Sequence, residues 1–99
     1  MILAVDIGNS NIVIGCFDKK DILFVERLST NHQSTSLEYM VMIKNILELN
    51  GLGNAQIDGG IISSVVPPLT VTLKMAMERL GYGEILVVGP GIKLSLIHI

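Results

Sequence analysis

The N-terminal stretch Met1–Phe17 constrains the fold of this chain more than any other part of it. An apolar run, Ile2–Ile7, carries a single acid and is followed by the polar turn Gly8–Asn11 and a second apolar run, Ile12–Phe17. Both runs are rich in β-branched residues and are bounded by turn residues, as strands are. We therefore predict a β-hairpin with the Asp6 carboxylate beside its turn.

The rest of the chain predicts three more strands and two helices. They are a third antiparallel strand at Ile22–Leu28, a helix from Thr35 to Asn50, a strand buried on both faces at Gly59–Val66, a helix from Pro68 to Leu80 and a short strand at Glu84–Val88. Thr35 and Glu38 have the spacing of a capping box, and Gly51 can adopt the left-handed conformation that ends a helix. The order β-β-β-α-β-α-β predicts an α/β fold, a mixed five-stranded sheet with helices packed on its faces.

Apolar spacing predicts which side of each helix enters the core. In the first helix the expected inward positions are Leu37, Met40, Val41, Ile43, Ile46 and Leu47. In the second helix they are Leu69, Thr72, Leu73, Ala76 and Leu80. Cys16 is expected in the core, and the methionines of the helices are interpreted as packing residues, namely Met40, Met42, Met75 and Met77.

The composition of the 99-residue chain argues against several classes of protein. Its 49% hydrophobic and 16% charged residues are typical of one globular domain, and its net charge is −2 with no basic stripe. We therefore expect no nucleic-acid partner. No apolar run reaches the roughly 18 residues of a membrane helix, and no basic segment precedes the apolar start, so we expect neither a membrane anchor nor a signal peptide. The lone Cys16 fits a reducing cytosol, which predicts a cytoplasmic protein.

The turn after the first strand has the chemistry of a nucleotide phosphate site. Gly8 lets the backbone approach a phosphate closely, and consecutive amides from Gly8 to Asn11 can point into one concavity. The side chains of Asn9, Ser10 and Asn11 add small hydrogen-bonding groups. Asp6 would repel phosphate directly, so its expected partner is Mg²⁺, held through a water molecule because this ion keeps much of its hydration. The alternative is a plain hairpin turn whose amides Asp6 caps.

Two serines lie near the end of the fourth predicted strand, where ligands gather in open α/β sheets. This position predicts that Ser64 lines a cleft near the phosphates. The alternative, which we favour for Ser63, is that Pro67-Pro68 stops the strand and the serines satisfy local backbone groups. The turn Gly89–Gly91 either leads toward a substrate pocket or only ends a strand.

Three other polar residues have simpler interpretations. His32 lies in a polar loop and is expected to be solvated. Glu38 is better explained as a helix cap than as a catalytic base. Arg27 could reach a ligand, but a surface salt bridge is the default expectation for an arginine on a strand.

Three motifs in register resemble the type III pantothenate kinase family. The strand–turn–strand segment around Asp6–Asn11 resembles the first phosphate loop of the actin, sugar-kinase and heat-shock ATPase superfamily. Ser63–Leu69 reads Ser-Ser-Val-Val-Pro-Pro-Leu and Val88–Gly91 reads Val-Gly-Pro-Gly, and both are similar to segments of that family. The polar stretch Arg27–Thr30 after the third strand also fits. The resemblance covers residues 1–93.

The resemblance implies a fold and an activity. It implies that residues 1–93 are a ribonuclease-H-like, actin-like ATPase lobe of an enzyme that phosphorylates pantothenate with ATP, the first step of coenzyme A biosynthesis. It also implies Mg²⁺ with ATP, a monovalent cation (K⁺ or NH₄⁺) and a homodimer. The phosphate-binding residues carried over are Asp6, Ile7, Gly8, Asn9, Ser10, Asn11, Ile12 and Val13, with Asp6 on Mg²⁺. No residue here matches the family's catalytic acid, its pantothenate-binding segment or its monovalent-cation ligand, so we expect these beyond the end of the chain.

The end of the chain departs from the family pattern. Leu94–Ile99 resemble the translation of a sequencing-library adapter, and we expect them to be a non-native tail on a truncated kinase. The chain as given is therefore expected to lack kinase activity by itself. Two other classes of protein stay open: a regulatory accessory factor built on the same nucleotide-binding lobe, and an ATPase lobe of chaperone or cell-shape type.

Overall fold

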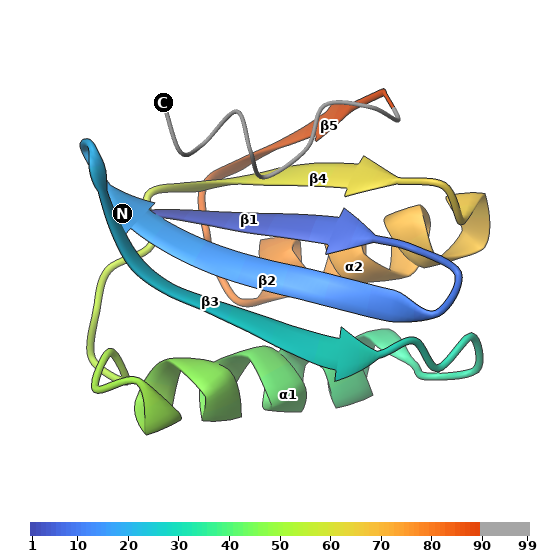
Figure 1. Cartoon of the computed structure of the whole chain (residues 1–99), viewed down its shortest axis with the longest axis horizontal. Coiled ribbons are helices and arrows are strands. Elements are labelled where there is room, and N and C mark those ends of the chain that lie inside the picture. Colours follow the sequence, from blue (N-terminus) through green and yellow to red (C-terminus); the bar gives the residue numbers. More distant parts are fainter. Residues whose placement is uncertain (90–99) are drawn as a thin grey trace.

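In the computed structural model, which describes residues 1–89, five strands and two helices follow the predicted order (Figure 1). The elements are β1 (Ile2–Ile7), β2 (Asn11–Asp18), β3 (Asp21–Ser29), α1 (Ser36–Leu49), β4 (Gly59–Ser64), α2 (Pro67–Arg79) and β5 (Glu84–Val88). The α/β class and the element order are confirmed. The predicted turn through Pro90 and Gly91 and the predicted non-native tail at 94–99 lie outside the described residues.

β1 lies at the centre of a mixed five-stranded sheet whose strand order is β3-β2-β1-β4-β5. β1, β2 and β3 form an antiparallel meander, whereas β1, β4 and β5 run parallel to one another. Parallel neighbours need a crossover connection, and α2 supplies the one between β4 and β5. The carboxyl ends of the three parallel strands therefore meet at one edge of the sheet, next to the turn that follows β1.

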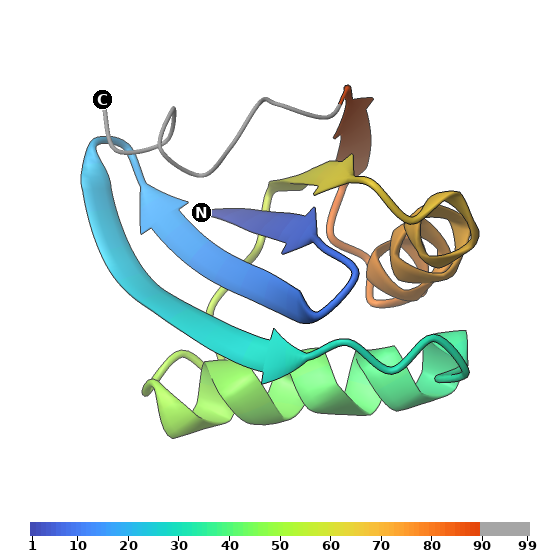
Figure 2. The same cartoon turned by 45° about the vertical axis from the view of Figure 1, so that its right-hand side comes forward.

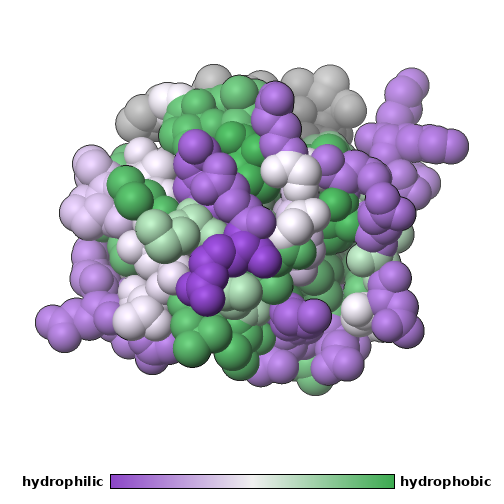
Figure 3. Space-filling model, turned by 180° about the vertical axis from the view of Figure 1, so that it is seen from behind, coloured by the Kyte–Doolittle hydropathy of each residue, from purple (hydrophilic) through white to green (hydrophobic). Residues whose placement is uncertain are grey.

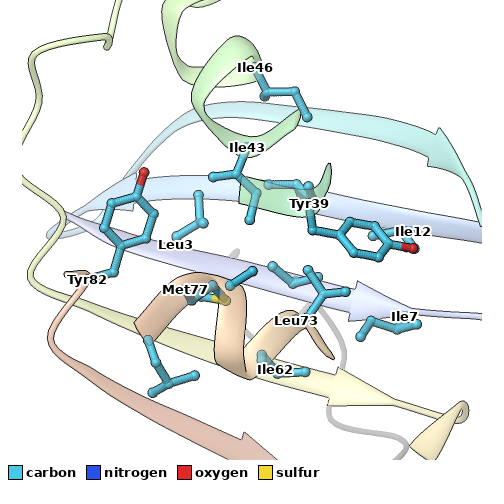
Figure 4. Packing of buried hydrophobic residues seen from close by; sticks show 14 of the residues in the cluster. Leu3, Ile7, Ile12, Tyr39, Ile43, Ile46, Ile62, Leu73, Met77 and Tyr82 are labelled. Carbon is cyan, nitrogen blue, oxygen red and sulfur yellow. The ribbon is translucent and has the colours of Figure 1, made fainter. Parts of the chain in front are cut away.

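Both helices pack on the same face of the sheet and close a single hydrophobic core (Figure 2). Alternate residues of β1 point into this core, because side chains alternate between the two faces of a strand. These inward residues are Leu3, Val5 and Ile7. Figure 4 shows residues of both helices packed around the strands, among them Tyr39 and Ile43 of α1 and Leu73 and Met77 of α2. Cys16 is fully buried in the same core, as predicted.

The buried side of each helix differs in part from the predicted one. Leu37 and Val41 were expected in the core but are 56% and 52% exposed, and Tyr39 is buried instead. The spacing in α1 is compatible with two overlapping stripes, and burial of the large Tyr39 ring removes more apolar surface from water. In α2 the expected Thr72 and Leu80 are only half-buried. The buried positions of α2 are Leu69, Leu73, Ala76 and Met77.

β4 ends two residues earlier than predicted because Ser64 turns the chain. The Ser64 hydroxyl accepts a hydrogen bond from the Val66 amide at 2.9 Å and donates one to the Val66 carbonyl at 3.1 Å. α2 then begins at Pro67, one residue before the predicted start, and proline suits this first turn because its missing N–H would have no helical partner. No helix among residues 1–89 is long and apolar enough to cross a membrane.

Candidate functional site

The turn between β1 and β2 closes tightly on itself. The Gly8 amide donates a hydrogen bond to the Asn11 carbonyl at 2.9 Å. A Cβ atom at position 8 would lie 3.0 Å from that same oxygen, which is closer than ordinary contact, so a larger residue fits only if this oxygen shifts slightly. The two residues between them are exposed at the tip, while Ile7 and Ile12 on either side are fully buried. The predicted phosphate-binding segment therefore has a rigid base and an accessible tip.

A second segment, Thr30–His32, holds this turn from one side. The Thr30 hydroxyl donates to the Gly8 carbonyl at 2.8 Å, and the Thr30 amide donates to the Ser10 carbonyl at 3.0 Å. Nε2 of His32 lies 3.1 Å from the Asn9 carbonyl oxygen, and since a carbonyl only accepts, the ring nitrogen is the donor. His32 is exposed, as expected, but it also contacts the turn. Sequence reasoning missed this segment, whose only signal was the polar stretch that follows the third strand.

The main-chain amides at the tip of the turn differ from its carbonyls, because they form no hydrogen bond within residues 1–89. None of the hydrogen bonds within residues 1–89 uses the amide of Asn9 or Ser10. Successive main-chain amides that are left without acceptors in a turn can form a concavity that binds anions. The turn can therefore receive the oxygen atoms of a phosphate group.

Asp6 lies beside this turn on the face of the sheet opposite the two helices. It is half-buried at the carboxyl end of β1 and pairs with Val13 of β2 and Ser63 of β4. Val13 pairs in turn with Arg27 of β3. Because paired residues of neighbouring strands project from the same face, these four side chains form one row across the sheet. The row brings a carboxylate, a hydroxyl and a guanidinium to the edge that carries the turn.

The structure does not bring Ser64 together with Asp6. Ser64 pairs with Ile7, whose side chain lies in the core, so it projects from the helix-covered face. Its hydroxyl is already engaged in the turn that precedes α2. The serine in the row with Asp6 is Ser63, for which sequence reasoning favoured a purely local role.

The expected salt bridge of Arg27 is also not among the ion pairs of residues 1–89. Those pairs join the Met1 amino group to Asp58 and Lys74 to Glu78. Arg27 is exposed on β3.

The segment that holds the turn is itself anchored in the core. The Tyr39 ring is buried, and its hydroxyl donates to the Asn31 carbonyl at 3.0 Å. In Figure 4 this hydroxyl points toward the end of the sheet where β1 ends. Burial raises the pKa of the Tyr39 hydroxyl above its usual value of 10.0, so the donor stays protonated at neutral pH. Glu38 caps α1, as predicted, in a reciprocal pair of hydrogen bonds with Thr35.

The donor set at this edge fits the magnesium ion that accompanies a nucleotide. No group of three or more His, Cys, Asp or Glu side chains gathers within the described part of the chain. Mg²⁺ bound with a nucleotide needs only one or two carboxylates, because phosphates and water supply its other ligands. Asp6 provides one such carboxylate. A separate, mostly apolar groove of about 410 Å³ lies between α2 and β5 and includes no residue of the turn.

Comparison with solved structures identifies the fold. The structure of Thermus thermophilus RuvC in complex with a Holliday junction substrate matches with a TM-score of 0.59 and 17% sequence identity, covering 90% of this chain and 64% of that chain. A second T. thermophilus RuvC structure matches with a TM-score of 0.55 and 16% identity over 90% of this chain and 61% of that one. At this level of identity the likeness concerns the fold alone. The chain is thus a ribonuclease-H-like lobe, as the resemblance implied.

Sequence comparison then places the chain in a family. The model of the family described as type III pantothenate kinase matches residues 2–98, and the chain belongs to that family. The type III pantothenate kinase of Geobacter sulfurreducens is 46% identical over 100 residues, and that of Brevibacillus brevis is 42% identical over 96 residues. Each match covers 97% of this chain but 38% of the relative. The chain therefore spans less than two-fifths of the length of these curated relatives.

Proposed function

We propose that this chain is the nucleotide-binding lobe of a kinase that transfers the γ-phosphate of ATP to pantothenate and forms 4'-phosphopantothenate, the first step of coenzyme A biosynthesis. The observation that carries the proposal is the β1–β2 turn, in which the amides of Asn9 and Ser10 have no acceptor among residues 1–89 and which follows the half-buried Asp6. Membership of the family supports the choice of substrate. Phosphoryl transfer depends mainly on positioning and charge neutralisation, which are the tasks such a turn can perform.

Each residue of the turn has a proposed task. The amides of Asn9 and Ser10 bind oxygen atoms of the ATP phosphates, and the neighbouring Asn11 side chain adds a further hydrogen-bonding group. Asp6 orients the water shell of Mg²⁺, and the ion neutralises phosphate charge when it is bound. Ile7, Ile12 and Val13 hold the backbone of the turn in place through the sheet and core rather than by touching the nucleotide.

The remaining parts of the proposed activity fall outside this chain. We assign the catalytic acid, the pantothenate-binding residues and the ligands of the monovalent cation, K⁺ or NH₄⁺, to the part of the whole protein that the relatives have and this chain lacks. We also propose that the whole protein is a cytoplasmic homodimer. These assignments rest on the family alone.

Replacement of Asp6 tests the nucleotide site. We expect Asp6→Asn to weaken the binding of ATP in the presence of Mg²⁺ by roughly tenfold, the scale of one charge-assisted contact. In EDTA the same variant is expected to bind ATP at least as well as wild type, because a negative charge near the phosphates is gone. Isothermal titration calorimetry measures both. Asp18→Asn, an exposed acid at the far end of β2, is the matched control.

Two outcomes would argue against the proposal. Equal Mg²⁺-dependent affinity in Asp6→Asn and wild type would remove Asp6 from the site. For the whole protein, a phosphorylation assay that compares pantothenate with sugars, with and without K⁺, tests the reaction. Nucleotide binding without any turnover there would favour the regulatory accessory factor instead.

A further inference from the structure

The Thr30–His32 segment contacts the carbonyl oxygens of the β1–β2 turn and, within residues 1–89, leaves the amides of its tip free for a ligand. Its three contacts take the carbonyls of Gly8, Asn9 and Ser10, which are consecutive in the chain. The Asn11 carbonyl is taken by the Gly8 amide. Every carbonyl oxygen of the turn thus has a partner within the protein.

The hydrogen bonds of these carbonyls affect ligand binding, because each carbonyl oxygen is the negative end of a dipole. A carbonyl oxygen that faced the ligand would repel a phosphate and would attract a cation instead. With these oxygens directed to residues 30–32, the amides of Asn9 and Ser10 stay without a partner among residues 1–89. The same segment therefore determines whether the tip of the turn offers donors or acceptors.

The Thr30–His32 segment is anchored to the hydrophobic core by a hydrogen bond. The carbonyl of Asn31, between the two contacting residues, accepts the hydrogen bond of the buried Tyr39. Oδ1 of Asn31 accepts from the Gln33 amide at 3.0 Å, which holds the segment in a local turn. A preorganised site spends less free energy on ordering when a ligand binds.

We propose that Thr30 and His32 are positioning residues that present the Asn9 and Ser10 amides to a polyphosphate anion. The inference deepens the proposed function and rests on it for the identity of the anion as the phosphates of ATP. Thr30 contributes more to this positioning than His32 does. It makes two of the three contacts and is half-buried, whereas His32 is exposed. Neither residue touches the reacting atoms.

Replacement of the Thr30 hydroxyl tests this role at nearly constant volume. Thr30→Val removes the contact to Gly8, and Thr30→Ser keeps it. We expect Thr30→Val to weaken the binding of tripolyphosphate and of ATP with Mg²⁺ by about three- to tenfold, the range of one lost hydrogen bond, and Thr30→Ser to restore most of that affinity. Thr72→Val is the control, because within residues 1–89 that hydroxyl bonds only to the Pro68 carbonyl of the same helix, α2. In a whole kinase the loss should appear in the KM for ATP and not in the KM for pantothenate.

Amide NMR of the ligand-free chain supplies the second readout. Thr30→Val should lower the backbone order parameters of residues 8–11, and Thr30→Ser should return them. Unchanged order in Thr30→Val, or lowered order with unchanged affinity for tripolyphosphate, would overturn the positioning role. Tripolyphosphate binding that depends on Thr30, in a protein that does not bind ATP, would uphold the positioning role and contradict the proposed function. No binding of either anion by wild type would contradict both.

For His32 the matched pair is His32→Ala and His32→Gln. The glutamine amide can donate to the Asn9 carbonyl in place of Nε2. We expect a smaller loss of affinity in His32→Ala than in Thr30→Val, and its recovery in His32→Gln. Equal affinities in all three proteins would remove His32 from the proposal.

Discussion

At Gly8 a Cβ atom would lie in tight contact with the Asn11 carbonyl oxygen, at 3.0 Å. The same oxygen accepts the hydrogen bond that closes the turn. Glycine is favoured here by this contact and not by an unusual backbone angle, since the glycines with positive φ among residues 1–89 are Gly51, Gly81 and Gly83. A single methyl group at this position would need the oxygen that closes the turn to move by a few tenths of an ångström.

Gly8→Ala is therefore expected to open the turn. We expect it to lower the free energy of unfolding by about 1–3 kcal/mol, the usual cost of overpacking, and to weaken the binding of ATP with Mg²⁺. Urea unfolding and calorimetric titration measure the two effects. Gly89→Ala is the control, because a Cβ atom there meets nothing within 4 Å among residues 1–89. Wild-type stability and affinity in Gly8→Ala would show that the turn accommodates the added methyl group and would contradict this prediction.

At the scale of one element, α1 begins shortly after the Thr30–His32 segment that supports the turn. The Thr35 amide donates to Oε1 of Glu38 at 2.8 Å, and the Glu38 amide donates to the Thr35 hydroxyl at 3.2 Å. The hydrogen bond from the Thr35 main chain, and then that from its side chain, lower the pKa of the Glu38 carboxyl below its usual 4.5. A lowered folded-state pKa means that this stabilisation is complete above the unfolded value and is lost as the pH falls through the folded one.

Acid titration of stability tests the capping box. We expect the melting temperature of wild type to fall more steeply than that of Glu38→Gln as the pH drops below 4.5, because glutamine keeps a hydrogen-bond acceptor without a titrating charge. Thermal unfolding followed by circular dichroism from pH 7 to pH 3 measures the slopes. Glu48→Gln, an exposed residue of the same helix, is the control. Parallel curves for wild type and Glu38→Gln would exclude a contribution of the Glu38 charge.

On the scale of the whole molecule, this lobe exposes a considerable amount of apolar surface. Figure 3 shows hydrophobic patches between the hydrophilic side chains of one face. Exposed large hydrophobic residues occur on both helices and on both edge strands. They include Val25 of β3, Leu37 and Val41 of α1, Val71 and Met75 of α2, and Leu86 of β5. Single exposed apolar residues are common on folded proteins, whereas a large contiguous apolar patch is typical of an interaction site.

We predict that the 99-residue chain has no pantothenate kinase activity by itself. It carries a candidate phosphate site but spans less than two-fifths of the length of its relatives. We expect the catalytic acid to belong to the part of those relatives that this chain does not cover. A coupled assay with ATP, Mg²⁺ and pantothenate measures turnover, with the whole Geobacter sulfurreducens relative as the positive control. Turnover by the chain alone would mean that its own residues supply the missing chemistry.

Local patterns were sufficient wherever the controlling contact lies close in the sequence. The capping box spans three positions, and Gly51 ends α1 with the expected positive φ of 75°. The hairpin of β1 and β2 likewise follows from β-branched runs on either side of a short polar turn. Patterns were insufficient for the face of α1, because Leu37 and Tyr39 both fit an apolar stripe and only the packed sheet selects between them.

The sequence by itself determined the order of the elements, the position of the turn between β1 and β2 and the family to which the chain belongs. Tertiary structure alone decided which side chains gather around that turn. Ser63 rather than Ser64 lies in the row with Asp6, because strand register selects the face on which each side chain projects. Thr30 reaches Gly8 across a separation of 22 residues. Such contacts leave no local pattern, since they exist only after β3 and α1 have packed beside the first hairpin.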